Sequence, residues 1–222
     1  MSPRILSGAL VAGLVAGFLA ALLNLWTLTP LILEAEGFEG AHLHDGEEHV
    51  HAAEPAGLSR AFGTVATTLV AYAGFGLLLG AGMALAARSG VAVDARRGLL
   101  WGLGGFAALH LAPAVGLPPE LPGMEAADLS ARQAWWALTV AATALGLAIL
   151  AFGRGAAQAA LGAALILLPH ALGAPQAVGH EGAVPPGLAA AFATRSLGVA
   201  AVSWALLGAL AGAWAARPAP VR

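Results

Sequence analysis

The feature that most constrains how this chain folds is a succession of apolar runs, each about as long as a bilayer is thick. A helix of about 20 residues crosses the hydrocarbon core of roughly 30 Å, and a segment in lipid must satisfy every backbone N–H and C=O group internally. We therefore expect an all-α polytopic membrane helix bundle of about six transmembrane helices, arranged as three hairpins. The expected spans lie near residues 5–31, 61–87, 99–117, 134–152, 156–172 and 192–215. The fifth span is short and is expected to be interrupted by Pro169.

Composition agrees with a lipid environment. Hydrophobic residues make up 59% of the 222 residues and charged residues only 10%, whereas a soluble domain carries about 25% charged residues. The chain has no cysteine, which excludes disulfides and thiolate metal sites. It also has no basic patch, so we expect membrane lipid and no nucleic acid as a partner. A single integral membrane domain over residues 1–222 is the simplest organisation.

The distribution of arginine predicts the orientation. Arg4 precedes the first run, as in a signal peptide, but this run is longer than a signal-peptide core and shows no clear cleavage site, so we expect a retained helix. With the N-terminus inside, seven arginines lie on the inner side (Arg4, Arg88, Arg96, Arg97, Arg154, Arg217 and Arg222) and three on the outer side (Arg60, Arg132 and Arg195). Positive charge favours the cytoplasmic side. We therefore expect a multi-pass protein of the cytoplasmic membrane with both termini in the cytoplasm.

A weak threefold repeat favours the hairpin arrangement. Each even-numbered span opens with an outer arginine, and each odd-numbered span is expected to break at an outer proline, which is Pro30, Pro113 or Pro169. Arg132 is expected to pair with Asp128, which lies four residues before it. Glycines spaced four apart predict close packing of helices. These pairs are Gly13 and Gly17, Gly76 and Gly80, Gly98 and Gly102, and Gly208 and Gly212.

The densest polar cluster is HLHDGEEHVHA, residues 42–52, which we call the histidine loop. It holds four of the seven histidines and three of the twelve acids, within a His- and acid-rich extracytoplasmic loop expected over residues 34–60. Imidazole and carboxylate together suit borderline divalent ions such as Co²⁺, Ni²⁺ and Zn²⁺. The pattern therefore predicts capture of a divalent metal ion by His42, His44, His49 and His51. The alternative is a solvated polar loop that binds no ion.

Two further histidines, His110 and His170, are expected at membrane depth, each near a proline. Titratable groups at that depth are costly and usually have a function, and a proline leaves a helix carbonyl without its N–H partner. With Glu34 and Glu36 at the end of the first span, the two histidines are predicted to form a metal relay, in which His170 contributes more than His110. The alternatives are interfacial structural histidines and carboxylates at the water boundary.

The sequence carries no enzyme signature: it has no phosphate-binding glycine loop, no HExxH motif, and no serine with a matched base in a span. We therefore expect no catalysis and no tightly bound cofactor. The expected ligand is a bound or transported divalent metal ion.

Three stretches carry a resemblance to a known family: TPLILEAE, RRGLLWGLGGFAALHLAPAVGLPPELPGMEAADLSARQAWW and LLPHALGAP. The chain resembles the CbtA family, the proposed cobalt transporter subunit of cobalamin-producing microbes. The resemblance covers most of the chain and implies a multi-pass membrane protein in cobalt uptake. It also implies a small single-span partner that bears histidine, CbtB, but no ligand set. Two alternatives stay open: a metal-binding accessory or sensor protein, and a membrane scaffold without transport activity.

Overall fold

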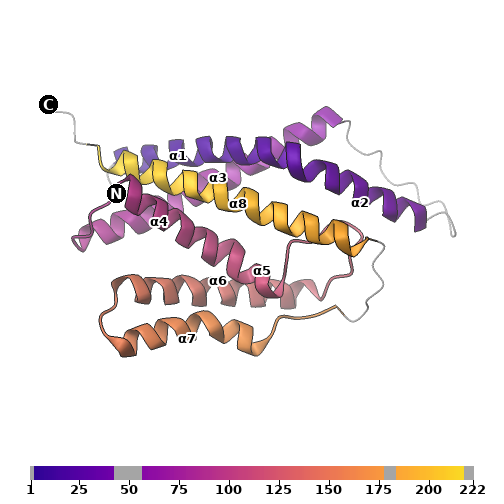
Figure 1. Ribbon diagram of the computed structural model, residues 1–222. Coiled ribbons are helices and arrows are strands. Elements are labelled where there is room, and N and C mark those ends of the chain that lie inside the picture. The colour runs from indigo at the N-terminus through magenta and orange to yellow at the C-terminus, as the bar shows by residue number, and fades with distance from the viewer. Residues whose placement is uncertain (1–2, 43–56, 178–183, 218–222) are drawn as a thin grey trace. The chain divides into compact units, whose positions relative to one another are not determined.

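The computed structural model describes residues 3–42, 57–177 and 184–217, and the regular elements within these ranges are all helical (Figure 1). They are α1 (Pro3–Leu23), the π-helical turn η1 (Asn24–Leu28), α2 (Thr29–His42), α3 (Gly57–Arg88), α4 (Ala95–Phe106), the π-helical turn η3 (Ala107–Leu111), α5 (Ala112–Gly116), α6 (Leu129–Phe152), α7 (Ala156–Leu172) and α8 (Pro186–Ala215). The predicted all-α fold is confirmed.

The helices match the expected membrane spans. Within the described residues, five helical stretches are long and apolar enough to cross a membrane: Leu6–Phe38, Gly57–Arg88, Ala95–Gly116, Leu129–Phe152 and Pro186–Ala215. Helix α7 is also apolar but has only 17 residues, in agreement with a short fifth span. At 1.5 Å per residue it is about 26 Å long, close to the thickness of the hydrocarbon core.

The prediction that the odd-numbered spans break at their prolines is wrong. The chain stays helical past Pro30 as α2 and past Pro113 as α5, and in both places the turn before the proline is π-helical. A proline ring clashes with the carbonyl four residues before it in a regular α-helix, and the wider turn relieves this crowding. The residue before each proline accordingly bonds five residues back, Thr29 N–H to the Asn24 carbonyl and Ala112 N–H to the Ala107 carbonyl.

Pro169 does not interrupt its helix either. It lies in the last turn of α7, which ends at Leu172, and its carbonyl accepts the N–H of Gly173 at 3.1 Å. Gly173 has a φ of +83°, a conformation that glycine adopts without strain and that ends many helices. Only three residues of α7 follow Pro169, so little of the helix lies beyond the proline to be disturbed by it.

The described chain forms two compact units. Unit 1 contains α1 with η1, α3, α4 to residue 103, and α8 from residue 198. Unit 2 contains α2 from residue 30, η3, α5, α6, α7, and α8 to residue 197. The segment expected as a loop over residues 34–60 is helical at both ends, because α2 extends to His42 and α3 begins at Gly57; residues 43–56 lie outside the described ranges.

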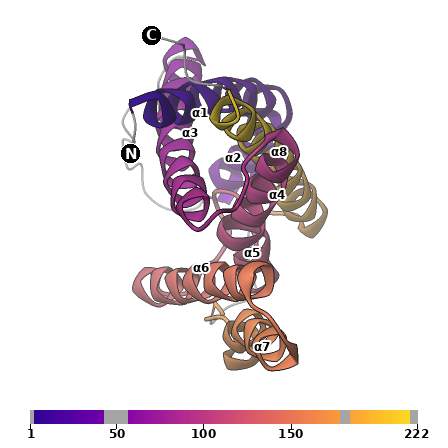
Figure 2. The same cartoon turned by 90° about the vertical axis from the view of Figure 1, so that its left-hand side faces the viewer.

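Close helix contacts through glycine hold unit 1 together, as predicted. Helices α1 and α3 pack against each other (Figure 2), and a Cβ atom added at Gly76 of α3 would overlap the carbonyl oxygen of Ala9 in α1. Helices α4 and α8 make the same kind of contact, where a Cβ atom at Gly208 would overlap the carbonyl oxygen of Gly98. Only glycine lets the backbones come this near, which is how helices associate in lipid.

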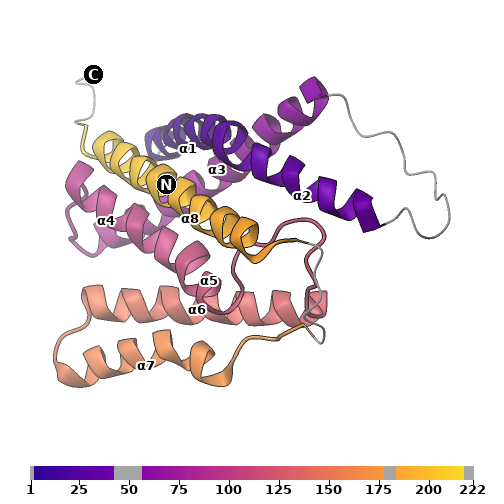
Figure 3. The same ribbon diagram turned by 45° about the vertical axis from the view of Figure 1, so that its right-hand side comes forward.

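Unit 2 is built around the antiparallel pair α6 and α7, which lie side by side (Figures 1 and 3). Gly146 and Gly162 face each other across this pair, and Trp135 donates its ring N–H to the Pro169 carbonyl at 3.2 Å. A second buried cluster joins α2, the connection before α6 and the start of α8. Its buried residues are Leu31, Ala35, Leu121, Val184 and Leu188.

Candidate functional site

The site is built on η3, the π-helical turn that contains His110. The turn exists because Pro113 follows it, and a π-helical turn inside an α-helix often marks a functional position. Pro113 also has no N–H to donate to a carbonyl of the turn before it. The Phe106 ring stacks on the imidazole of His110 at 6.3 Å between centroids and 17° between planes. His110 is thus held in a widened stretch of an apolar span.

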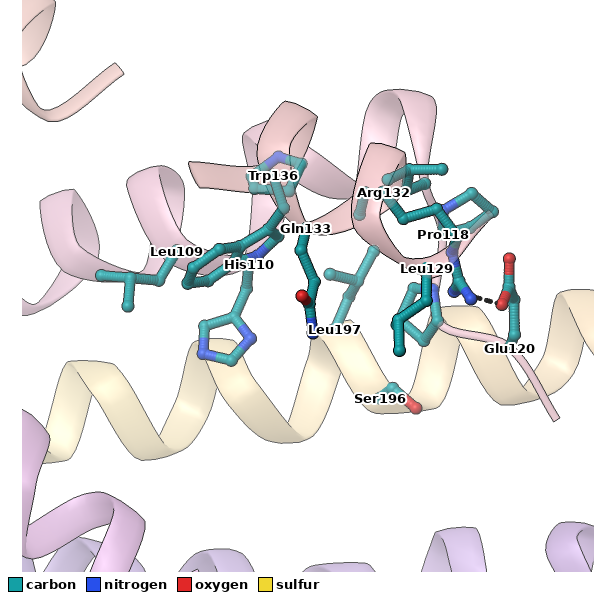
Figure 4. Close-up of a pocket in the computed structure, with 14 residues that line it drawn as sticks. Leu109, His110, Pro118, Glu120, Leu129, Arg132, Gln133, Trp136, Ser196 and Leu197 are labelled. Atoms are coloured by element: carbon teal, nitrogen blue, oxygen red, sulfur yellow. Dashed lines mark hydrogen bonds and ion pairs between the residues drawn. The ribbon is translucent and has the colours of Figure 1, made fainter. Parts of the chain in front are cut away.

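His110 lines a cavity of about 370 Å³ within unit 2. The other polar residues of its wall are Glu120, Arg132, Gln133 and Ser196, and apolar residues such as Pro113, Leu117 and Trp136 complete it (Figure 4). These side chains come from η3, α5, the connection between α5 and α6, the first turns of α6, and α8. Polar side chains that carry oxygen and nitrogen atoms therefore line one cavity inside a largely apolar unit.

The partner of Arg132 is Glu120, not Asp128 as the helical spacing predicted. The Nη2 group of Arg132 donates to the Oε2 atom of Glu120 (Figure 4), and the side chains are only 27% and 22% exposed. Asp128 instead caps α6, with a carboxylate that accepts the N–H of Ala131 at 2.9 Å and the hydroxyl of Ser130. Satisfying a bare N–H at the helix start outweighs a surface ion pair of small net energy. These hydrogen bonds, first the one from Ser130, hold the pKa of Asp128 below its usual value.

His170 lies elsewhere in unit 2 and does not line the cavity. It is in the last turn of α7, where its ring meets Trp135 edge to face, with centroids 6.0 Å apart and planes at 70°. The carbonyl of Pro169 accepts hydrogen bonds from the ring N–H of Trp135 and the backbone N–H of Gly173. In this conformation, the surroundings of His170 are aromatic packing rather than a set of metal ligands.

Glu34 and Glu36 lie on α2, and neither lines the cavity. Helix α2 packs Leu31 and Ala35 into the buried cluster, which leaves Glu34 exposed and Glu36 half-buried. Among the described residues, no group of three or more histidine and acidic side chains is placed to hold a metal ion. The structure therefore does not bring together the four residues of the predicted relay, and their role in metal transfer stays a prediction.

The histidine loop falls mostly outside the described residues. His42 is the last residue of α2, but its side chain is not among those described. His44, His49 and His51 lie outside the described ranges. Metal capture by these four histidines also stays a prediction.

Three polar residues of the cavity were not singled out from the sequence: Glu120, Gln133 and Ser196. Glu120 follows two prolines in a connection, Gln133 comes directly after Arg132, and Ser196 follows Arg195 in the N-terminal half of α8. A polar residue beside an arginine or a proline near the end of a predicted span could have indicated these cavity residues. Many other residues at a membrane interface share this pattern, so it does not single them out.

The family model described as "Probable cobalt transporter subunit (CbtA)" matches residues 2–216. Comparison with the curated proteins and with the solved structures returns no match.

Proposed function

The chain belongs to the CbtA family of probable cobalt transporter subunits, and from this membership we propose that it takes up a divalent metal ion, cobalt, through the cavity of His110. The observation that carries the proposal is the position of His110, on a π-helical turn within an apolar span, in the wall of a cavity with further oxygen and nitrogen donors. An ion that leaves water needs replacement ligands. Neutral imidazole with oxygen donors suits Co²⁺.

We propose two stages of binding. The histidine loop captures the ion on the extracytoplasmic face, where His42, His44, His49 and His51 supply imidazole and nearby acids supply carboxylate. The ion then passes to His110 in the wall of the cavity. Glu34, Glu36 and His170 do not line this cavity, so their part in the relay stays a prediction that the His170→Ala variant below tests in part. Capture requires neutral imidazoles, whose usual pKa is about 6.5, so it should weaken as the outer medium becomes acidic.

The description of the family as a transporter subunit implies a partner. We propose a small single-span membrane protein that bears histidine, similar to CbtB, in the cytoplasmic membrane. Both termini of the chain would lie in the cytoplasm, as the distribution of arginine favours.

Uptake of Co²⁺ into proteoliposomes of the purified protein, with and without the small partner, tests the proposal. His110→Ala should lower uptake by about tenfold or more at every metal concentration, since loss of a metal ligand costs at least as much as loss of a supporting group. Joint replacement of His42, His44, His49 and His51 should lower uptake at low metal and spare it at high metal.

His170→Ala is the comparison variant, because it removes a histidine that does not line the cavity. Loss of uptake in this variant would extend the pathway to α7. Normal uptake by His110→Ala over the whole concentration range would reject the cavity as the pathway. Metal binding by the wild type without any uptake would favour an accessory or sensor protein instead.

A further inference from the structure

We propose that Glu120 is a metal ligand at the outer part of the cavity, and that Arg132 is the resident cation which the arriving metal ion displaces from it. The inference rests on the proposed function, in which a divalent cation enters this cavity. It extends the site beyond His110 to Glu120 and Arg132, and it proposes that one cation replaces another there.

The first support is the position of the pair. Glu120 and Arg132 both line the cavity that contains His110, and they bind each other there (Figure 4). Glu120 is the one carboxylate in the described wall of this cavity. Carboxylate is a ligand that Co²⁺ accepts, as imidazole is. In Figure 4 Glu120 and His110 lie toward opposite ends of the cavity, so Glu120 supplies a carboxylate at a second point in it.

The second support is that the backbone on both sides of the pair is fixed. Leu121, directly after Glu120, is 4% exposed within the buried cluster, and its N–H donates to the sulfur of Met124 at 3.2 Å. Pro118 and Pro119 restrict the chain before Glu120. On the other side, Arg132 donates its backbone N–H to the Asp128 carbonyl at 3.0 Å in the first turn of α6. The carboxylate is thus presented from a rigid connection, while the long side chain of Arg132 is the part that can move.

The third support is the incomplete bonding of Arg132. Its Nε atom is buried and has no acceptor among the described residues, so Glu120 holds the guanidinium at one end only. Arg132 can therefore leave Glu120 for water at the membrane surface, where arginine commonly extends. When Co²⁺ binds, Glu120 exchanges one positive partner for another and is never left as an unpaired charge.

Co²⁺ binding to the purified full-length protein, measured by calorimetry in detergent, tests the exchange. Glu120→Gln should weaken binding by about tenfold or more, and Arg132→Gln should strengthen it by about tenfold, because it removes the competing cation. The double variant should match Glu120→Gln alone, since Arg132 acts only through Glu120. Arg132→Lys keeps the charge and should stay within about threefold of the wild type, which covers the case that Arg132→Gln does not fold.

Arg60→Gln is the matched control, because Arg60 lies at the corresponding end of α3 and does not line the cavity. It should leave Co²⁺ affinity unchanged. Weaker or unchanged binding by folded Arg132→Gln, or additive effects in the double variant, would overturn the exchange. If His110→Ala loses binding and uptake while Glu120→Gln changes neither, the exchange fails and the proposed function stands. If neither the wild type nor any variant binds Co²⁺, both fail.

Discussion

At the scale of single residues, the first turn of α6 shows how two acids divide two tasks. Asp128 and Glu120 are both within reach of this turn, but Asp128 bonds to the backbone and Glu120 bonds to Arg132. A helix start leaves several N–H groups without partners, and the nearest short acidic side chain takes one of them. Arg132 therefore pairs with Glu120, the acid in the preceding connection. The ion pair of Arg132 and Glu120 lines the cavity because Asp128 bonds to the helix backbone instead.

The cap at Asp128 predicts a pH dependence of stability. Its hydrogen bonds, first the one from Ser130, lower the pKa of the Asp128 carboxyl in the folded protein below the usual value of 3.8. The ionised carboxylate therefore stabilises the fold above pH 3.8. This contribution is lost as the pH falls through the pKa that Asp128 has in the folded protein. Asp128→Asn keeps a capping oxygen but does not titrate. Thermal unfolding in detergent, followed by circular dichroism from about pH 7 to 3, should show a steeper loss of stability in the wild type than in Asp128→Asn below about pH 4. Equal acid sensitivity of the two proteins would contradict the assignment.

At the scale of elements, the two π-helical turns are equivalent features of the first and third spans. Each has five residues, and each ends two residues before a proline, η1 before Pro30 and η3 before Pro113. Helix α7 has its proline in the last turn and keeps an α-helical turn before it, so the third member of the predicted repeat lacks the widened turn. Of the two widened turns, only the one at η3 contains a histidine.

Replacing Pro113 tests whether the widened turn positions His110. Pro113→Ala supplies an N–H and removes the ring, so η3 can return to an α-helical register. That change would rotate His110 relative to the helix beyond it by about 100°, the angle per residue of an α-helix. We expect Co²⁺ uptake to fall at least as far as in His110→Ala, while thermal stability stays equal or rises. Pro186→Ala is the control, because a proline at the first position of a helix lacks only an N–H that has no helical partner. Wild-type uptake by Pro113→Ala would show that the turn is only a packing feature.

Glycine contacts between elements give a prediction on stability. Gly208→Ala should destabilise the α4–α8 contact by about 1–3 kcal/mol, because the new methyl group would overlap the Gly98 backbone. Gly198→Ala, in the same helix, has no other atom within 4 Å of its added methyl group. It should be neutral or stabilising by up to about 1 kcal/mol, since alanine favours helix more than glycine does. Thermal unfolding of both variants in detergent measures the difference, and an equal effect of the two changes would count against the contact.

At the scale of the whole molecule, charge and hydropathy set the arrangement relative to a membrane. The described helices comprise five candidate spans and the shorter α7, and the inner ends predicted for them carry most of the arginines. Arg217 illustrates such an end, because its guanidinium lies 4.4 Å from the centre of the Trp214 ring, a pair suited to a membrane interface. The described wall of the candidate cavity comes entirely from unit 2.

The orientation can be tested because the chain has no cysteine, so each introduced thiol is the only one. Glu125 lies in the connection before α6 and Asp94 in the connection before α4, and both are exposed. An impermeant thiol reagent added to intact cells should label Glu125→Cys. Asp94→Cys should be labelled only after the cells are opened, because the excess of arginine predicts that this side faces the cytoplasm. Labelling of both positions from the same side would reject a topology with both termini inside.

The sequence by itself determined the properties that depend on hydropathy and local spacing. The apolar runs are long enough that lipid forces them to be helical, and this predicted the number of helices, the short α7 and the glycine contacts of α1 with α3 and α4 with α8. The motifs around His110 and His170 were also sufficient to indicate the family. Each of these properties can be read from residues that are neighbours in the chain.

Only the tertiary structure decided which polar side chains share a space. Glu120, Gln133 and Ser196 meet His110 because the helices and connections that carry them pack together, and no period in the sequence links these positions. The same packing pairs Arg132 with Glu120 rather than with Asp128. It also places His170 against Trp135, away from the cavity. Pro113 widened a turn rather than ending a helix, because neighbouring backbone groups could re-form their hydrogen bonds one residue further back. Such outcomes depend on contacts between distant segments, which hydropathy does not encode.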